Sequence, residues 1–214
     1  MDGGIVICGA ENRVSSCAMS LVEQHRETRR TRNHAATRVS ILDAARRVAA
    51  RDGARDLSLR AVAAEAGYAP AALYGYFRNK DELLLALAAD DLSGLARAMR
   101  EEMQVHHDGK LAAAASVALD LLENTETFAA VSSALPSHAG AGDAERLFNG
   151  RMIAALTALS EAVGGGASRE AQADVVLIAA TLAGLALLGR SGRLDALGFD
   201  SPELLARLER HFSV

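Results

Sequence analysis

All three tyrosines of the chain, Tyr68, Tyr74 and Tyr76, lie in one segment, residues 59–80. Two short apolar runs in this segment are separated by Gly67, and this layout predicts a helix-turn-helix. The second run consists mainly of small or compact residues, so its backbone can closely approach base edges in the major groove of a duplex. The alternative, an aromatic cluster in a helical core, does not explain why every tyrosine lies here.

Three helices are predicted to position this segment. Apolar residues recur with helical spacing over residues 41–49. Ser58 is the expected N-cap of the next helix, which Gly67 ends by adopting a left-handed conformation. Pro70 suits the first position of a third helix, where a backbone N–H is not needed. The expected ranges are residues 37–52, 59–66 and 70–77.

The composition predicts that the rest of the chain is also helical. Half of the residues are hydrophobic, only 4% are aromatic and none is Trp, so Ala, Leu and Val must build the core, which favours helices. Evenly spaced strands with turn signals are missing, which argues against an all-β fold. We therefore expect an all-α fold of about nine helices. After residue 78 the expected helices cover residues 79–103, 110–124, 127–135, 143–163, 168–190 and 204–212.

The charge is unevenly distributed along the chain. The net charge is −4, but residues 24–60 contain ten arginines and four acids, a local charge of +6, which leaves −10 for the remainder. We therefore expect only the N-terminal part to contact a polyanion. A solvated basic tail is the alternative explanation of the arginine run.

Residues 41–84 resemble the N-terminal DNA-binding domain of TetR-type (TetR/AcrR) transcriptional regulators. The matching sequence is ILDAARRVAARDG, followed by SLRAVAAEAGYAPAALYGYFRNKDELL, about a fifth of the chain. The resemblance implies a three-helix helix-turn-helix domain followed by a helical effector-binding and dimerisation domain. The expected divisions are a flexible, partly basic extension over residues 1–36, a DNA-binding domain over 37–82 and an effector domain over 83–214.

The function implied by the resemblance is that of a homodimeric, ligand-responsive regulator in the cytoplasm. It would be a repressor that a small molecule releases from a palindromic operator in double-stranded DNA. No enzymatic activity, cofactor or metal is expected, because no Ser–His–Asp, metal-binding or phosphate-loop arrangement stands out in the sequence. The rival hypothesis is a helical small-molecule carrier or enzyme with a vestigial DNA-binding fold.

The resemblance also implies roles for individual residues in DNA binding. Ser58, with the backbone amides after it, would hold a phosphate. Tyr74, Tyr76 and Lys80 would contact other backbone phosphates. The residues that would face the bases are Pro70, Ala71, Ala72 and Gly75.

The base-facing residues depart from the usual chemistry of sequence recognition. None of them has a side chain that can hydrogen-bond a base, so reading must depend on methyl contacts, tyrosine hydroxyls or DNA shape. We expect neighbouring arginines to supplement these contacts by reaching the DNA backbone or a narrow minor groove. The candidates are Arg29, Arg30, Arg32 and Arg38.

The C-terminal part has bulky apolar residues suited to a pocket for a hydrophobic effector, although core packing explains them equally well. They are Met99, Met103, Phe128, Phe148 and Met152. The uncharged stretch from Val175 to Gly189 has fifteen residues, too short to span a membrane. With the helix from Leu204 to Phe212 it is the expected dimer interface. Cys8 and Cys17 both lie in the N-terminal extension, which fits a reduced cytoplasmic setting.

Overall fold

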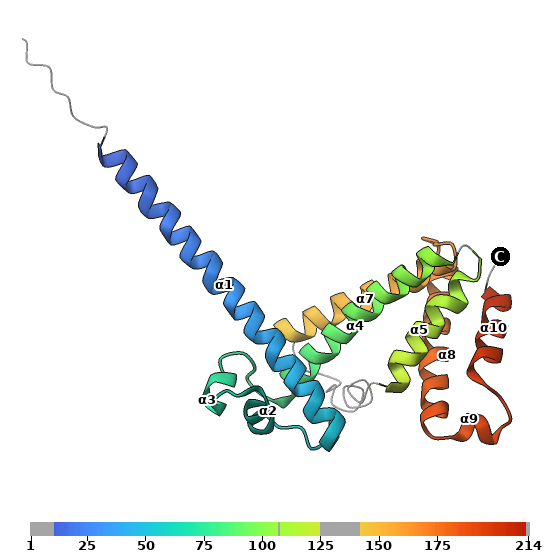
Figure 1. Ribbon diagram of the computed structural model, residues 1–214. Coiled ribbons are helices and arrows are strands. Elements are labelled where there is room, and N and C mark those ends of the chain that lie inside the picture. Colours follow the sequence, from blue (N-terminus) through green and yellow to red (C-terminus); the bar gives the residue numbers. More distant parts are fainter. Residues whose placement is uncertain (1–10, 107, 125–141, 213–214) are drawn as a thin grey trace, which may run out of the picture.

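The computed structural model describes residues 11–106, 108–124 and 142–212, with side chains from residue 23 onward. All regular structure in these residues is helical, which confirms the predicted all-α fold (Figure 1). The expected helix over residues 127–135, with Phe128, lies outside the described residues. The helices described are α1 (Glu11–Asp52), α2 (Leu59–Ala66), α3 (Pro70–Leu73), α4 (Lys80–Val105), α5 (Lys110–Asn124), α7 (Asp143–Ala162), α8 (Arg169–Arg190), α9 (Arg193–Ala196) and α10 (Ser201–Phe212).

Helix α1 is far longer than expected. Residues 11–36, predicted to be a flexible extension, continue the helix in the N-terminal direction; we call them the arm. The prediction was wrong because it looked for an apolar period, whereas a helix needs only favourable residues, and residues 11–52 contain no Gly or Pro. Figure 1 shows the arm pointing away from the rest of the molecule.

The second half of α1 packs with α2 and α3 into a small unit that we call the head. Its core residues Ile41, Val62, Leu73 and Phe77 are almost completely buried. Gly67 ends α2 in the left-handed conformation, with φ 74°, as the sequence predicts. The head is thus built as expected from its local signals.

Helix α3 ends at Leu73 instead of residue 77. The amides of Gly75 and Tyr76 donate to the carbonyls of Ala72 and Leu73, at 3.2 and 2.9 Å. These bonds span three residues, as in a tight turn, rather than the four of an α-helix. Tyr74 and Tyr76 therefore belong to the turn after α3.

Helix α4 links the head to the remaining helices, which we call the body. Asn79 caps its N-terminus, because the side-chain oxygen accepts from the amide of Glu82 at 2.8 Å. The Glu82 carboxylate accepts in return from the amide of Arg78 at 2.7 Å. Farther along, α4 packs against α5 and α7, and Figure 1 shows it running beside α7.

Helix α8 contains a long apolar stretch. By length and composition alone its 22 residues could cross a membrane. One face, with Val175, Ile178, Leu182 and Ala186, is buried, and the helix packs against α5, α7 and α10. The other face exposes Val176, Leu177 and Leu187, each by more than half. Helix α8 is therefore packed into the body along one side only.

Candidate nucleic-acid interface and the joint behind it

The residues predicted to face DNA bases form an exposed surface on the head. Pro70, Ala71 and Ala72 on α3, and Gly75 in the following turn, are all exposed. Tyr74 is 57% exposed beside them. Because Leu73 and Phe77 are buried underneath, the head holds this surface in a fixed position. The sequence prediction that this segment is accessible agrees with the structure.

Two of the predicted phosphate ligands have intramolecular hydrogen-bond partners. The Ser58 hydroxyl oxygen accepts from the amide of Ala61 at 3.2 Å as the N-cap of α2, and its O–H can still donate outward. The Lys80 ammonium donates to the backbone carbonyl of Arg55, which fixes its position at the start of α4. Both groups therefore have restricted positions.

The turn after α3 is held against the base of the arm. The His34 ring stacks on the Tyr76 ring with a centroid distance of 4.4 Å and an interplanar angle of 23°. One turn further along α1, the Arg38 guanidinium carbon lies 4.7 Å from the centroid of the Phe77 ring, in cation–π geometry. Sequence reasoning missed His34, because nothing local relates it to a tyrosine forty-two residues later.

The arginines at the C-terminal end of α1 are neutralised within the head. The Glu65 carboxylate on α2 accepts from Arg47 at 2.7 Å and from Arg51 at 3.0 Å. These hydrogen bonds lower the pKa of Glu65. Arg51 also pairs with Asp52. The local charge of the sequence therefore overstates the positive charge that this end of α1 offers to a polyanion.

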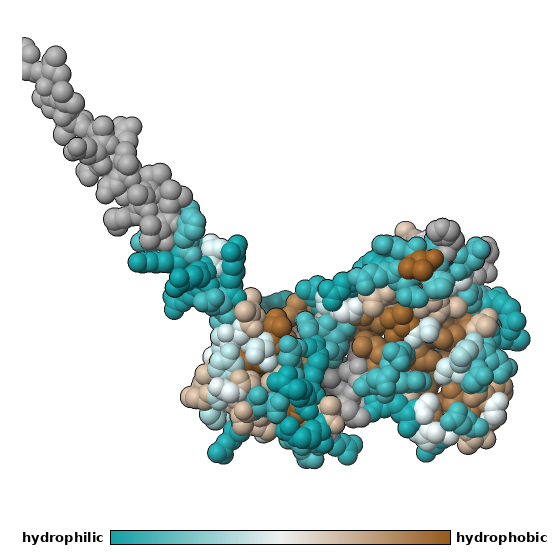
Figure 2. All heavy atoms as spheres, in the orientation of Figure 1, coloured by the Kyte–Doolittle hydropathy of each residue, from teal (hydrophilic) through white to brown (hydrophobic). Residues whose placement is uncertain are grey.

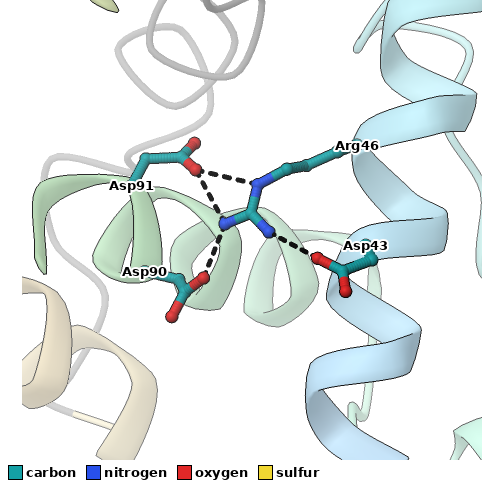
Figure 3. Close-up of polar contacts among 4 residues, drawn as sticks. All are labelled: Asp43, Arg46, Asp90 and Asp91. Carbon is teal, nitrogen blue, oxygen red and sulfur yellow. Dashed lines mark hydrogen bonds and ion pairs between the residues drawn. The ribbon is translucent and has the colours of Figure 1, made fainter. Parts of the chain in front are cut away.

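Arg46 joins the head to the body (Figure 3). Its guanidinium donates to Asp91 on α4 at 2.9 and 3.0 Å, to Asp90 at 2.6 Å and to Asp43 on its own helix at 2.9 Å. Burial opposes the charged form, but the hydrogen bonds and charges of Asp90 and Asp91 outweigh it and raise the pKa of Arg46. The Asp91 side chain is only 7% exposed. We call this cluster the Arg46 joint.

A hollow of about 330 Å³ lies beside the joint, lined by Arg46, Asp90, Asp91 and neighbouring residues that include Leu95 and Leu121. Neither the joint nor the hollow is predictable from sequence patterns. Arg46 and its partners on α4 are separated by 44 and 45 residues, and only the packing of α1 on α4 brings them together.

The predicted effector residues lie along the seam between α4 and α7. Met99, Met103 and Phe148 are buried and Met152 is partly buried. Arg100 of α4 pairs with Glu161 of α7 at 2.8 Å and also approaches the carbonyl of Ala154. The four residues are thus distributed along helices that pack closely, and whether they line an effector pocket remains a prediction.

A separate cleft of about 410 Å³ opens between α5 and α10. Its lining includes apolar residues such as Leu119 and Leu205, together with the carboxylates of Asp120, Glu123 and Glu209. Sequence analysis missed it, since the cleft depends on how α10 docks on α5. Its acidic lining is unsuited to an anionic ligand.

Comparisons with known proteins agree with this architecture. Residues 41–87 match the family model described as bacterial regulatory proteins, tetR family. Comparison with curated proteins gives no significant match.

Solved structures of similar fold cover most of the chain. A TetR-family transcriptional regulator from Streptomyces coelicolor is 22% identical with a TM-score of 0.61, over 83% of this chain and 97% of that one. The regulator FadR from Bacillus subtilis in complex with stearoyl-CoA is 20% identical with a TM-score of 0.57, over 79% and 94%. BioQ with its double-stranded DNA operator is 21% identical with a TM-score of 0.50, over 79% and 95%.

The family match covers the head and the start of α4, and the shared fold extends through the body. The family match and the shared fold are both consistent with a head that exposes the α3 surface and with the helices packed around it. Residues 41–87 therefore belong to the tetR family of bacterial regulatory proteins, and the chain as a whole shares the fold of a TetR-family regulator.

Proposed function

We propose that the protein is a homodimeric DNA-binding transcriptional regulator of the cytoplasm, a repressor that a small apolar molecule releases from a palindromic operator. The observation that carries the proposal is the exposed surface of Pro70, Ala71, Ala72 and Gly75 beside Tyr74. Small residues at this surface let the backbone of α3 approach base edges in a major groove. The DNA-bound structure of BioQ, which has the same fold, supports this use of the head.

The outer face of α8 supports the proposed dimer. Val176, Leu177 and Leu187 are exposed on a helix whose opposite face is already buried in the body. A second copy would cover such apolar side chains. We propose the region from Val175 to Gly189 on α8, with α10 beside it, as the interface. In a dimer, two heads about 34–36 Å apart would reach successive major grooves of a palindrome.

The proposed effector region is the seam between α4 and α7, where Met99, Met103, Phe148 and Met152 lie. The complex of FadR with stearoyl-CoA supports a ligand site in a body of this fold. Because α4 also carries Asp90 and Asp91 of the Arg46 joint, a ligand that shifts α4 would change the position of the head. The coupling expected of such a shift is about 1–3 kcal/mol.

The experiment is an electrophoretic mobility shift of the full chain with DNA from upstream of its own gene, repeated over a range of salt concentrations. We expect a specific complex whose affinity falls steeply with salt, as for about 6–10 phosphate contacts per dimer. The rival hypothesis of a carrier or enzyme with a vestigial head predicts that no complex forms.

A further inference from the structure

We propose that the arm of α1 is a second DNA-contacting element, which binds phosphates of the duplex that flanks the base pairs under α3. This inference rests on the proposed function and extends it from the head to the arm. We assign the contact to the four arginines of the arm whose side chains the structure describes: Arg26, Arg29, Arg30 and Arg32.

The first observation is that these arginines are exposed and make no ion pair with any residue that the structure describes. Arg26, Arg29 and Arg30 are spaced by three and four residues, so they share one face of the helix. By contrast, Arg46, Arg47 and Arg51 on the same helix each bind carboxylates. Within α1, the arginines near the C-terminal end hold the fold together through ion pairs, whereas those of the arm have no carboxylate partner among the described residues.

The second observation is that the part of the arm whose side chains the structure describes, residues 23–36, has no apolar face suited to a protein partner. Of residues 23–36, only Ala35 and Ala36 are apolar, and every side chain in this range is exposed. A helix that is polar on all sides gains little by packing on another helix, and two copies of a basic helix repel each other. Figure 2 shows the described part of the arm as a hydrophilic surface. Charge complementarity favours nucleic acid over a second copy of the chain.

The third observation is that the arm is attached rigidly to the DNA-facing surface. His34 stacks on Tyr76, and Arg38 lies over Phe77, so the arm and the turn after α3 form one unit. From Arg38 to Arg26 the helix rises about 18 Å, the length of about five base pairs. When α3 lies in a major groove, the arginines are held at a fixed offset from it.

The helical form of the arm favours one of the two expectations for its arginines, contact with the DNA backbone, over entry into a narrow minor groove. An α-helix with side chains is about 10–12 Å wide, whereas the minor groove is about 6 Å wide. The helix cannot follow the groove as an extended tail would. Phosphates along the duplex backbone are the groups that exposed arginines on such a helix can reach.

The test compares two triple variants of the full chain. One replaces Arg26, Arg29 and Arg30 by Gln, which keeps the helical propensity. The other makes the same change at Arg151, Arg169 and Arg193, which are exposed arginines of the body with no ion pair to a described residue. Binding is measured by fluorescence anisotropy over a salt series, with random-sequence duplexes of about 20 and about 40 base pairs, since two heads span about 20.

We expect the arm variant to lose at least about tenfold in affinity for the longer duplex. The fall of its log affinity with log salt concentration should also be less steep, by about three per protomer. Its affinity for the shorter duplex should fall less, and the body variant should behave like the wild type. Equal results for the arm and body variants on the longer duplex would overturn the inference, as would an equal loss on both duplexes. Failure of the wild type to bind either duplex, together with no complex on the DNA upstream of its own gene, would instead refute the proposed function. The oligomeric state of the arm variant is measured by sedimentation. If it differs from that of the wild type, the arm contacts a second copy of the chain, and this result would also overturn the inference.

Discussion

The two halves of α1 carry arginines in different surroundings. In the C-terminal half, Arg46, Arg47 and Arg51 bind carboxylates of α1, α2 and α4. In the arm, Arg26, Arg29 and Arg30 are exposed and pair with no described residue. The difference shows that one helix uses the same side chain both to hold the fold together and to present charge to the outside. A sequence count of arginines cannot distinguish these uses.

The largest difference in the free energy of unfolding is expected between the variants Arg46→Gln and Arg30→Gln. Loss of Arg46 removes the guanidinium from Asp90 and from the nearly buried Asp91, so the free energy of unfolding should fall by about 2 kcal/mol. Arg30→Gln should change it by less than about 0.5 kcal/mol, since the side chain is exposed. Urea denaturation followed by circular dichroism measures both values. Similar values for the two variants would contradict the contrast between the two halves.

Removal of residues 1–36 should affect DNA binding and leave the head and body intact. A chain that begins at Thr37 loses the His34–Tyr76 stack but keeps all buried residues of the head, so its thermal midpoint should stay close to that of the full chain. Its affinity for a duplex of about 40 base pairs should fall at least tenfold at low salt, because the arm arginines are lost. Fluorescence anisotropy measures the DNA affinity of the two chains, and calorimetry measures their thermal midpoints. Unchanged affinity together with an unchanged salt slope would assign no DNA contact to the arm.

A smaller effect is expected at the edge of the α3 surface. Tyr74→Phe removes a hydroxyl from a side chain that is 57% exposed, so stability should not change. If the hydroxyl donates to a phosphate, DNA affinity should fall by about fivefold, which corresponds to about 1 kcal/mol. Tyr68→Phe, also on an exposed tyrosine but before α3, is the matched control. Equal affinities of the two variants would remove Tyr74 from the interface.

The smallest effect is expected for Glu65→Gln, which breaks the ion pairs with Arg47 and Arg51. Because the hydrogen bonds from these arginines lower the pKa of Glu65 below its usual value of 4.5, its carboxylate stabilises the folded state at neutral pH. This contribution is lost as the pH falls through the lowered pKa. The wild type should therefore be slightly more stable than the variant at pH 7, and the difference should disappear at strongly acidic pH. A difference that stays constant with pH would show that the ion pairs are not its cause.

Local signals made the head predictable from the sequence. Ser58 caps α2, Gly67 ends it and Pro70 begins α3, and each of these roles depends only on nearby residues. The exposure of Ala71 and Ala72 follows from the same local pattern, since Leu73 and Phe77 supply the buried side of the segment.

Features that depend on packing or on distant residues could not be predicted in this way. The Arg46 joint connects residues more than forty positions apart, and the His34–Tyr76 stack does the same. The helical arm was missed because an exposed helix has no apolar period. The α5–α10 cleft depends on how α10 docks, which no spacing of residues specifies.

The most direct test of DNA binding by the α3 surface is the affinity of Ala71→Glu for a duplex of about 40 base pairs, compared with the wild type. Ala71 is exposed in the first turn of α3, where an acidic side chain is compatible with the helix. We expect an unchanged thermal midpoint and a loss of affinity of at least about tenfold, because a carboxylate on this base-facing surface would be repelled by the negatively charged duplex. A variant that binds the duplex as tightly as the wild type would contradict the account.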